Sequence, residues 1–257
     1  MLARFLAAVA AFSVVPLAHA TPGACAAKSG PGTAALVELY TSEGCDSCPP
    51  ADAWLRRLPA AGAGAIVPLS FHVDYWDYIG WKDPFASPAF GARQRELAAV
   101  TRARVVYTPQ VMLAGRDYRS WGSGARFAAD VRAVNAGPAR AEIALALAGT
   151  EPGGAELRAS ATVPKVEDRT DAALYVAVYE NGLSNKVTAG ENRGATLQHD
   201  FVVREWWGPV ALDRAGATEL VRKPAARSLA NGGVAAFVQS RRTGEVLQAL
   251  ALPACKG

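Results

Sequence analysis

The chain has 257 residues, of which 51% are hydrophobic and 19% are charged, and its formal net charge is +4 at pH 7. This length allows one large domain or two of ordinary size, and the apolar content is sufficient for a hydrophobic core. The charge is mild and no basic run is present, so nucleic acid is not expected as a partner.

The first twenty residues have the pattern of a secretory signal peptide. Arg4 provides a basic start, residues 5–17 are apolar, and Ala18-His19-Ala20 fits a small-x-small cleavage site. The apolar run is too short to span a bilayer comfortably, and a retained N-terminal anchor is the alternative. Cleavage would leave a mature chain without a membrane span, in the periplasm or outside the cell.

The first half of the remaining chain alternates between strand-like and helix-like patterns. An apolar run predicts a buried strand, a helical repeat of Trp54, Leu55 and Leu58 follows it, and an aromatic loop lies further on. A turn at Gly115 predicts a hairpin. The predicted elements are, in chain order, strand 35–41, helix 50–60, strand 65–72, loop 73–85, helix 88–101, strand 110–114, strand 116–121 and helix 123–135.

A pair of cysteines stands between the first strand and the first helix. Cys45 and Cys48 are separated by two residues, which is close enough to form a disulfide within one turn. A thiolate at a helix N-terminus is favoured by unpaired N–H groups and a partial positive charge, and the thiolate is the attacking species in disulfide exchange. The spacing predicts a redox pair; half of a zinc site and a structural staple are the alternatives.

Several segments of residues 34–135 resemble known families. Val106-Tyr-Thr-Pro-Gln-Val111 is similar to the glutaredoxin and thioredoxin segment that carries a cis-proline facing the dithiol. The segments Glu38-Leu-Tyr-Thr-Ser-Glu-Gly-Cys45 and Phe71-His-Val-Asp-Tyr-Trp-Asp77 resemble a family of secreted bacterial proteins with a thioredoxin-like domain and no settled function.

The resemblance implies an α/β thioredoxin-like domain over residues 34–137, preceded by an N-terminal segment of residues 21–33. It implies a cis Pro109, and it implies that the Thr108 backbone pairs with an incoming substrate. It also implies that Cys45 is the more exposed cysteine and the nucleophile, and that Cys48 resolves the mixed disulfide. The dipeptide Asp46-Ser47 departs from the Gly-Pro of thioredoxin.

The pattern changes after Pro138. Short runs with period-two alternation recur between turn signals such as Asn181-Gly182, which predicts an all-β, sandwich-like domain over residues 138–257. The predicted strands are 142–148, 157–163, 174–179, 195–205, 234–240 and 246–252.

The other two cysteines lie near the two ends of the mature chain. Export would place all four cysteines in an oxidising compartment. Because Cys45 and Cys48 pair most naturally with each other, we expect a structural disulfide between Cys25 and Cys255. Two independent thiols, or a bridge from one of them to another molecule, are the alternatives.

Further side chains are candidates for a site around the dithiol. Glu38 resembles the buried acid of thioredoxins, displaced by one residue, and could act as a base for Cys48; an exposed strand-edge glutamate is the alternative. His72 and Trp76 end the second strand and could form a substrate groove with a proton shuttle; packing of the aromatic loop is the alternative. The charge of Asp46 disfavours a nearby thiolate and so favours a reductant or isomerase over a strong oxidase.

The sequence therefore predicts an exported thiol–disulfide oxidoreductase that acts on protein thiols or disulfides without a cofactor or resident metal. One alternative is a periplasmic copper chaperone in which Cys45 and Cys48 bind copper together with His72 or His199. Another is a non-catalytic binding module with a structural disulfide.

Overall fold

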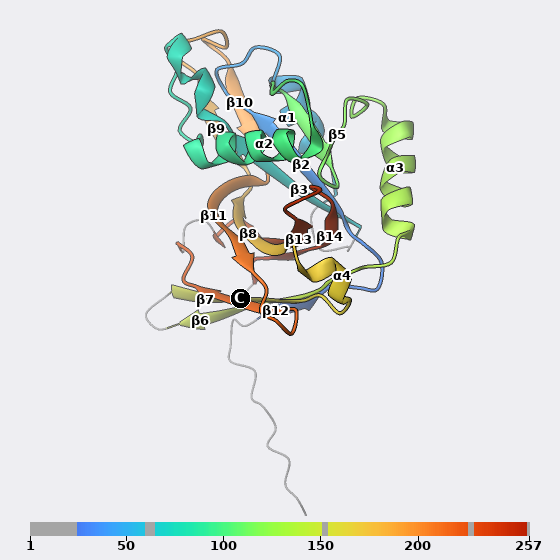
Figure 1. The fold of residues 1–257 in the computed structure, drawn as a ribbon. Helices are drawn as coiled ribbons and strands as arrows, with labels where there is room; N and C mark the ends of the chain where they lie inside the picture. Colours follow the sequence, from blue (N-terminus) through green and yellow to red (C-terminus); the bar gives the residue numbers. More distant parts are fainter. Residues whose placement is uncertain (1–24, 60–64, 151–153, 226–228, 256–257) are drawn as a thin grey trace, which may run out of the picture.

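The structure is a computed structural model that describes residues 25–59, 65–150, 154–225 and 229–255 (Figure 1). The predicted signal peptide lies outside the described residues. The helices within them are α1 (Pro49–Leu55), the 3-10 helix η1 (Asp74–Ile79), α2 (Pro88–Thr101), α3 (Gly124–Ala136) and α4 (Val166–Arg169). The strands are β1 (Cys25–Lys28), β2 (Ala35–Thr41), β3 (Ile66–His72), β4 (Gln110–Leu113), β5 (Arg116–Asp117), β6 (Glu142–Thr150), β7 (Gly154–Thr162), β8 (Ala172–Glu180), β9 (Leu183–Lys186), β10 (Thr196–His199), β11 (Val202–Ala211), β12 (Ala217–Arg222), β13 (Gly232–Ser240) and β14 (Val246–Pro253).

An eight-stranded mixed sheet forms the centre of the molecule. Its strand order is β14-β13-β8-β11-β3-β2-β4-β5. The predicted parallel pairing of the first two strands is confirmed by β2 and β3, and the predicted hairpin is confirmed by β4 and β5. The carboxyl ends of β2 and β3 therefore lie side by side, Thr41 opposite His72.

The predicted fold class, an α/β thioredoxin-like domain followed by a separate β-sandwich-like domain, is wrong. The structure is β-rich, and four strands of the second half, β8, β11, β13 and β14, continue the sheet that β2 to β5 begin. The junction is a parallel contact between β11 and β3 at Val202 and Ser70. The division of the chain into two domains near residue 137 stays a prediction. Helix α3 ends at Ala136, close to this point, but the large sheet contains strands from both sides of it.

Strands β8 and β13 explain why the sheet continues, because both are buried along almost their whole length. Alternate residues of β8 enter two different cores: Tyr175 and Tyr179 belong to a core shared with β2, β3 and α2. Val176 and Val178 belong to a second core, shared with β6 and β7. A strand that is apolar on both faces needs cover on both sides, so it takes an interior position in a larger assembly.

A second, four-stranded antiparallel sheet, β1-β6-β7-β12, covers one side of the β8–β13–β14 region (Figure 1). Cys25 begins β1, and a disulfide joins it to Cys255, which follows β14. The predicted Cys25–Cys255 disulfide is thereby confirmed.

The helices lie on both faces of the β2–β3 region. On one face, Thr41 bonds to Asp52 of α1, and Trp54 of α1 packs edge-on against Phe127 of α3, with ring centroids 5.1 Å apart. Since strand side chains alternate between faces, Glu38 points to the opposite face, towards α2. No helix within the described ranges is long and apolar enough to cross a membrane.

Candidate functional site

The segment 42–48, here called the dithiol loop, connects the end of β2 to the start of α1. Its turn is held by the backbone N–H of Cys45, which donates to Ser42 O at 3.2 Å, and by that of Cys48, which donates to Cys45 O at 3.2 Å. Cys45 and Cys48 form a disulfide. Helix α1 has only seven residues, because the helix ends at Leu55 rather than near residue 60.

Both cysteines of the dithiol loop are fully buried, with exposed fractions of 0%. The expectation that Cys45 is the more exposed of the two cysteines is therefore wrong. Asp46 and Ser47, between the cysteines, are exposed, so the loop reaches the surface through its two middle residues only. The charge of Asp46 faces water, where screening weakens its effect on neighbouring groups.

The loop 187–195 between β9 and β10, here called the cap loop, packs against the dithiol loop. Asn192 Nδ2 donates to Glu43 O at 2.8 Å and to Cys45 O at 2.9 Å. The backbone N–H of Asp46 donates to Glu191 Oε2 at 3.1 Å. The cap loop thus holds the dithiol loop by polar contacts from two adjacent side chains.

Trp76 connects the dithiol loop to the predicted substrate-binding segment. A Cβ atom on Gly44 would lie 3.3 Å from Trp76 Cβ, and Trp76 Nε1 donates to Thr108 Oγ1 at 2.6 Å. The Thr108–Pro109 peptide bond is cis, in agreement with the resemblance. Trp76, Thr108 and Pro109 are all partly exposed, so this predicted group does lie at an accessible surface beside the dithiol loop.

Glu38 lies elsewhere. It is fully buried, and its Oε1 accepts from Arg93 Nε of α2 at 2.7 Å and from Tyr40 Oη at 3.3 Å. Arg93 is itself buried, among the aromatic rings of Tyr175, Trp206 and Phe237. Burial would lower its pKa, but the carboxylate of Glu38 outweighs burial and raises it. Glu38 therefore has an ion-pair partner on the face of the sheet opposite α1, and its role as a base for Cys48 stays a prediction.

His72 is buried beneath the dithiol loop rather than placed in a surface groove. Its Nδ1 lies 2.7 Å from Asp83 Oδ2, and both side chains have 0% exposure. Asp83 also accepts the backbone N–H of Glu43 at 2.8 Å and that of Phe85 at 2.9 Å. Since an ionised carboxylate only accepts, Nδ1 of His72 carries the proton and Nε2 is left without one in the neutral ring.

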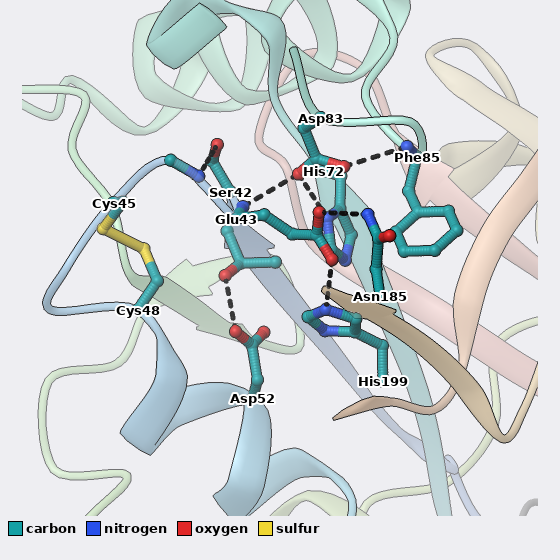
Figure 2. A network of polar contacts seen from close by, with 12 residues as sticks. Ser42, Glu43, Cys45, Cys48, Asp52, His72, Asp83, Phe85, Asn185 and His199 are labelled. Atoms are coloured by element: carbon teal, nitrogen blue, oxygen red, sulfur yellow. Dashed lines mark hydrogen bonds and ion pairs between the residues drawn. A yellow bond between two sulfur atoms is a disulfide. The ribbon is translucent and has the colours of Figure 1, made fainter. Parts of the chain in front are cut away.

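His199 of β10 also contacts a buried carboxylate, but through its other ring nitrogen. Its Nε2 lies 3.0 Å from Glu43 Oε1, and Glu43 Oε2 accepts from Asn185 at 2.9 Å and from Trp81 at 3.0 Å. The rings of His199 and His72 are T-shaped, with centroids 4.8 Å apart. Two histidines that are far apart in sequence therefore meet side by side, each oriented by its own carboxylate (Figure 2).

Asp52 of α1 completes this buried group, here called the histidine cluster: Asp52, His72 and His199 with the outer carboxylates Glu43 and Asp83. Thr41 Oγ1 donates to Asp52 Oδ2 at 3.2 Å. Burial raises the pKa of Asp52, against the opposing effect of the two histidines.

The pKa values of His72 and Asp83, which form a buried pair, are shifted in opposite directions. Burial would lower the pKa of His72, but Asp83, with Asp52 and Glu43, outweighs it and raises the pKa. For Asp83, burial would raise the pKa, but His72 and two backbone N–H groups hold it below its ordinary value.

Sequence reasoning missed most of the histidine cluster. Its acids belong to no recognised sequence motif: Glu43 precedes the cysteine pair by two residues, Asp52 follows it by four, and Asp83 lies in the aromatic loop. A helical turn places Asp52 beneath Cys48, and its backbone N–H donates to Cys48 O at 3.1 Å. That spacing was a readable signal. The pairing of Glu43 with His199, 156 residues later, was not.

The fold and site define a β-rich protein with two disulfides. One joins Cys25 of β1 to Cys255 after β14, and the other, Cys45–Cys48, is buried beside a histidine cluster. Residues 36–239 match the profile of the family described as "Protein of unknown function (DUF1223)", and the chain belongs to this family.

Two solved structures share the fold. Protein AGR_C_4864 from Agrobacterium tumefaciens is 24% identical with a TM-score of 0.63, over 89% of this chain and 98% of that one. HBP35 of Porphyromonas gingivalis is 15% identical with a TM-score of 0.64, over 88% of this chain and 76% of that one. A comparison with curated proteins gives no match.

Proposed function

We propose that the chain is an exported thiol–disulfide oxidoreductase whose reactive centre is the Cys45–Cys48 disulfide. The observation that carries the proposal is the form of this disulfide: it closes within a four-residue turn between a strand and a helix. The cap loop contacts the backbone beside it through the side chains of Glu191 and Asn192. The two disulfides of the chain are compatible with a secreted protein, and with the predicted signal peptide they support a periplasmic or extracellular location.

The reaction is an exchange in two steps. A substrate thiolate attacks Cys45 Sγ, the Cys45–Cys48 bond breaks, and Cys48 leaves as a thiolate while a mixed disulfide forms. A second substrate thiol then attacks the mixed disulfide, so the substrate is oxidised to a disulfide and Cys45 and Cys48 are left as the reduced dithiol. The reverse sequence reduces a substrate disulfide.

A protein is the proposed substrate because the accessible surface beside the dithiol loop is apolar. Tyr78, stacked near Trp76, is 83% exposed, and Val106, just before Thr108, is 37% exposed. Exposed apolar side chains in a group suit a protein partner. Both sulfurs are buried, so the cap loop must move before either can react.

The full burial of the disulfide favours one rival, a non-catalytic binding module in which the pair is a staple. The reduction potential of the pair separates the two. The mature chain is equilibrated with glutathione buffers, free thiols are trapped, and peptides carrying Cys45 and Cys48 are quantified separately from those carrying Cys25 and Cys255. A reversible potential between roughly −120 and −270 mV is expected, the range of exchange catalysts.

A potential well below about −300 mV, as in structural disulfides, would contradict the proposal and favour the staple. The double variant Cys45→Ala/Cys48→Ala is the control, since it must abolish the redox response assigned to this pair and leave that of Cys25 and Cys255. The same potential gives the direction of the reaction. A value of about −120 mV favours oxidation of substrates, and a value of about −270 mV favours their reduction.

A further inference from the structure

Three buried side-chain atoms of the histidine cluster have no hydrogen-bond partner among the described residues, and each is an acceptor when the histidines are neutral and Asp52 is ionised. They are Nε2 of His72, Nδ1 of His199 and Oδ1 of Asp52. One ligand atom from each of these residues lies within 4.8 Å of the other two, and the side chains face one another beneath the dithiol loop (Figure 2). Buried polar groups are nearly always paired, so three orphaned acceptors at one point call for a shared partner.

The structure assigns this point as a binding site for a divalent first-row transition metal ion, with His72, His199 and Asp52 as ligands. The site is separate from the proposed dithiol chemistry and does not depend on it. Two imidazole nitrogens and one carboxylate oxygen form a ligand set suited to zinc, copper or iron. Three protein ligands also leave a fourth position open, as in zinc sites that bind water or a substrate.

The outer carboxylates give an independent reason for this assignment. Metal-binding histidines commonly donate their other ring N–H to a carboxylate, which fixes the tautomer and orients the ring. Both histidines have this arrangement, His72 with Asp83 and His199 with Glu43. In each ring the nitrogen that is turned away from the outer carboxylate is the one without a partner.

The charge of the cluster points the same way. Three carboxylates, Asp52, Glu43 and Asp83, meet two imidazoles, and all five side chains are buried. The charged groups with the largest effects on the pKa values of His72 and Asp52 are the acids and histidines of this cluster itself. A divalent cation compensates this excess of negative charge and occupies the space between the three orphaned acceptors. Tetrahedral zinc ligands lie about 3.4 Å apart, so binding would draw the three atoms slightly closer together.

The ligand set differs from the copper site that the sequence suggested. In that hypothesis Cys45 and Cys48 supply two of the ligands, but their sulfurs are bonded to each other. Asp52 takes their place, and the site is complete while the disulfide is oxidised.

The test uses the full mature chain in its oxidised form. The protein is treated with a chelator, dialysed and titrated with ZnCl₂ by calorimetry, and with CoCl₂ by visible absorption. We expect one zinc ion per chain, a visible cobalt spectrum of a site with few ligands, and a rise in melting temperature with zinc concentration, because a ligand that binds only the folded state stabilises it. Anomalous diffraction from zinc-soaked crystals should place the ion between His72, His199 and Asp52.

Variants separate this site from other sources of binding. Asp52→Asn and His199→Asn are each expected to weaken zinc binding by more than the 10- to 100-fold that loss of an outer partner causes; Glu43→Gln should fall within that range. Cys45→Ala/Cys48→Ala should bind zinc as the wild type does, as should Asp130→Asn, a change in a partly exposed acid of α3. Circular dichroism checks that each variant is folded.

Three results would overturn the assignment. One is a folded wild-type chain that binds neither zinc nor cobalt in a one-to-one complex. The second is zinc binding that is lost with the cysteines and retained in Asp52→Asn. The third is an anomalous peak elsewhere on the chain, which needs no variant to fold. Each of these results leaves the reduction potential of the disulfide, and hence the proposed function, to be decided separately.

Discussion

At the scale of single residues, Arg93 is a buried cation that needs a buried negative partner. Its guanidinium carbon lies 4.9 Å from the ring centroids of Tyr175, Trp206 and Phe237, and its Nε bonds to the buried carboxylate of Glu38. Arg93 Nη2 also donates to Gln239 Oε1 at 3.1 Å. The ion pair joins α2 and β2 to the aromatic side chains of β8, β11 and β13, so it ties the first half of the chain to the second.

Removal of the negative partner should therefore be costly. In Glu38→Gln the arginine stays buried with its charge uncompensated, and breaking a buried pair in this way costs about 3–5 kcal/mol. Urea unfolding followed by tryptophan fluorescence measures the loss. The matched control is Asp130→Asn, which breaks the exposed i,i+4 pair with Arg126 and should change the free energy of unfolding little. Equal effects of the two variants would contradict this account of Glu38.

The same variant tests the sequence hypothesis for Glu38. If its carboxylate were the base for Cys48, Glu38→Gln would change the pH profile of disulfide reduction in the folded protein. If the ion pair with Arg93 is purely structural, the variant loses stability and the pH profile of disulfide reduction stays unchanged.

At the scale of elements, we propose that the cap loop controls access to the disulfide, because it is hydrogen-bonded to the dithiol loop. Asn192→Ala removes both side-chain hydrogen bonds to the dithiol loop, each worth about 0.5–1.5 kcal/mol. If the loop opens before the sulfurs react, the variant should be reduced by dithiothreitol roughly tenfold faster than the wild type, since about 1.4 kcal/mol corresponds to a factor of ten. Timed trapping of the Cys45 and Cys48 thiols measures the rate.

Asn231→Ala is the matched control for the cap loop. Asn231 is also an asparagine whose side chain donates to a backbone oxygen, that of Asn181 at 2.8 Å, but it does not bond to the dithiol loop. Its variant should be reduced at the wild-type rate. If both variants behaved alike, a local opening of the cap loop would not be the step that exposes the disulfide.

The elements also show what could be read from the sequence. Strands β2 and β3 and helix α2 agree with the prediction almost residue for residue, because both strands are short apolar runs and α2 begins with the capping Ser87 followed by Pro88. Strand β9, Leu183–Lys186, was missed because its four residues have no apolar run. It is placed instead by tertiary contacts such as that of Asn185 with Glu43, which no local pattern contains.

At the scale of the whole molecule, the failure of the predicted fold class has a definite origin. Period-two alternation was read in the second half as a sandwich, but residues 172–179 are apolar at every position. That pattern is typical of a strand buried on both faces. The sequence does not show what covers the face of β8 that carries Tyr175 and Tyr179. That face packs against residues of α2, β2 and β3, which are far from β8 in the chain. The histidine cluster was hidden for the same reason: its pairs form only when β10 packs beside α1 and β3.

The Cys25–Cys255 disulfide acts on the whole chain, because its ends are 230 residues apart. The entropy of closing so long a loop predicts that Cys25→Ala/Cys255→Ala lowers the free energy of unfolding by about 5.5 kcal/mol, whereas Cys45→Ala/Cys48→Ala, which opens a loop of four residues, should cost about 2 kcal/mol. Urea unfolding of both variants under oxidising conditions compares them directly, and alanine is used in both so that no hydroxyl is buried. If the long-loop variant lost no more stability than the short-loop one, then β1 and the end of β14 would be held by their strand pairing alone, with no contribution from restriction of the unfolded chain.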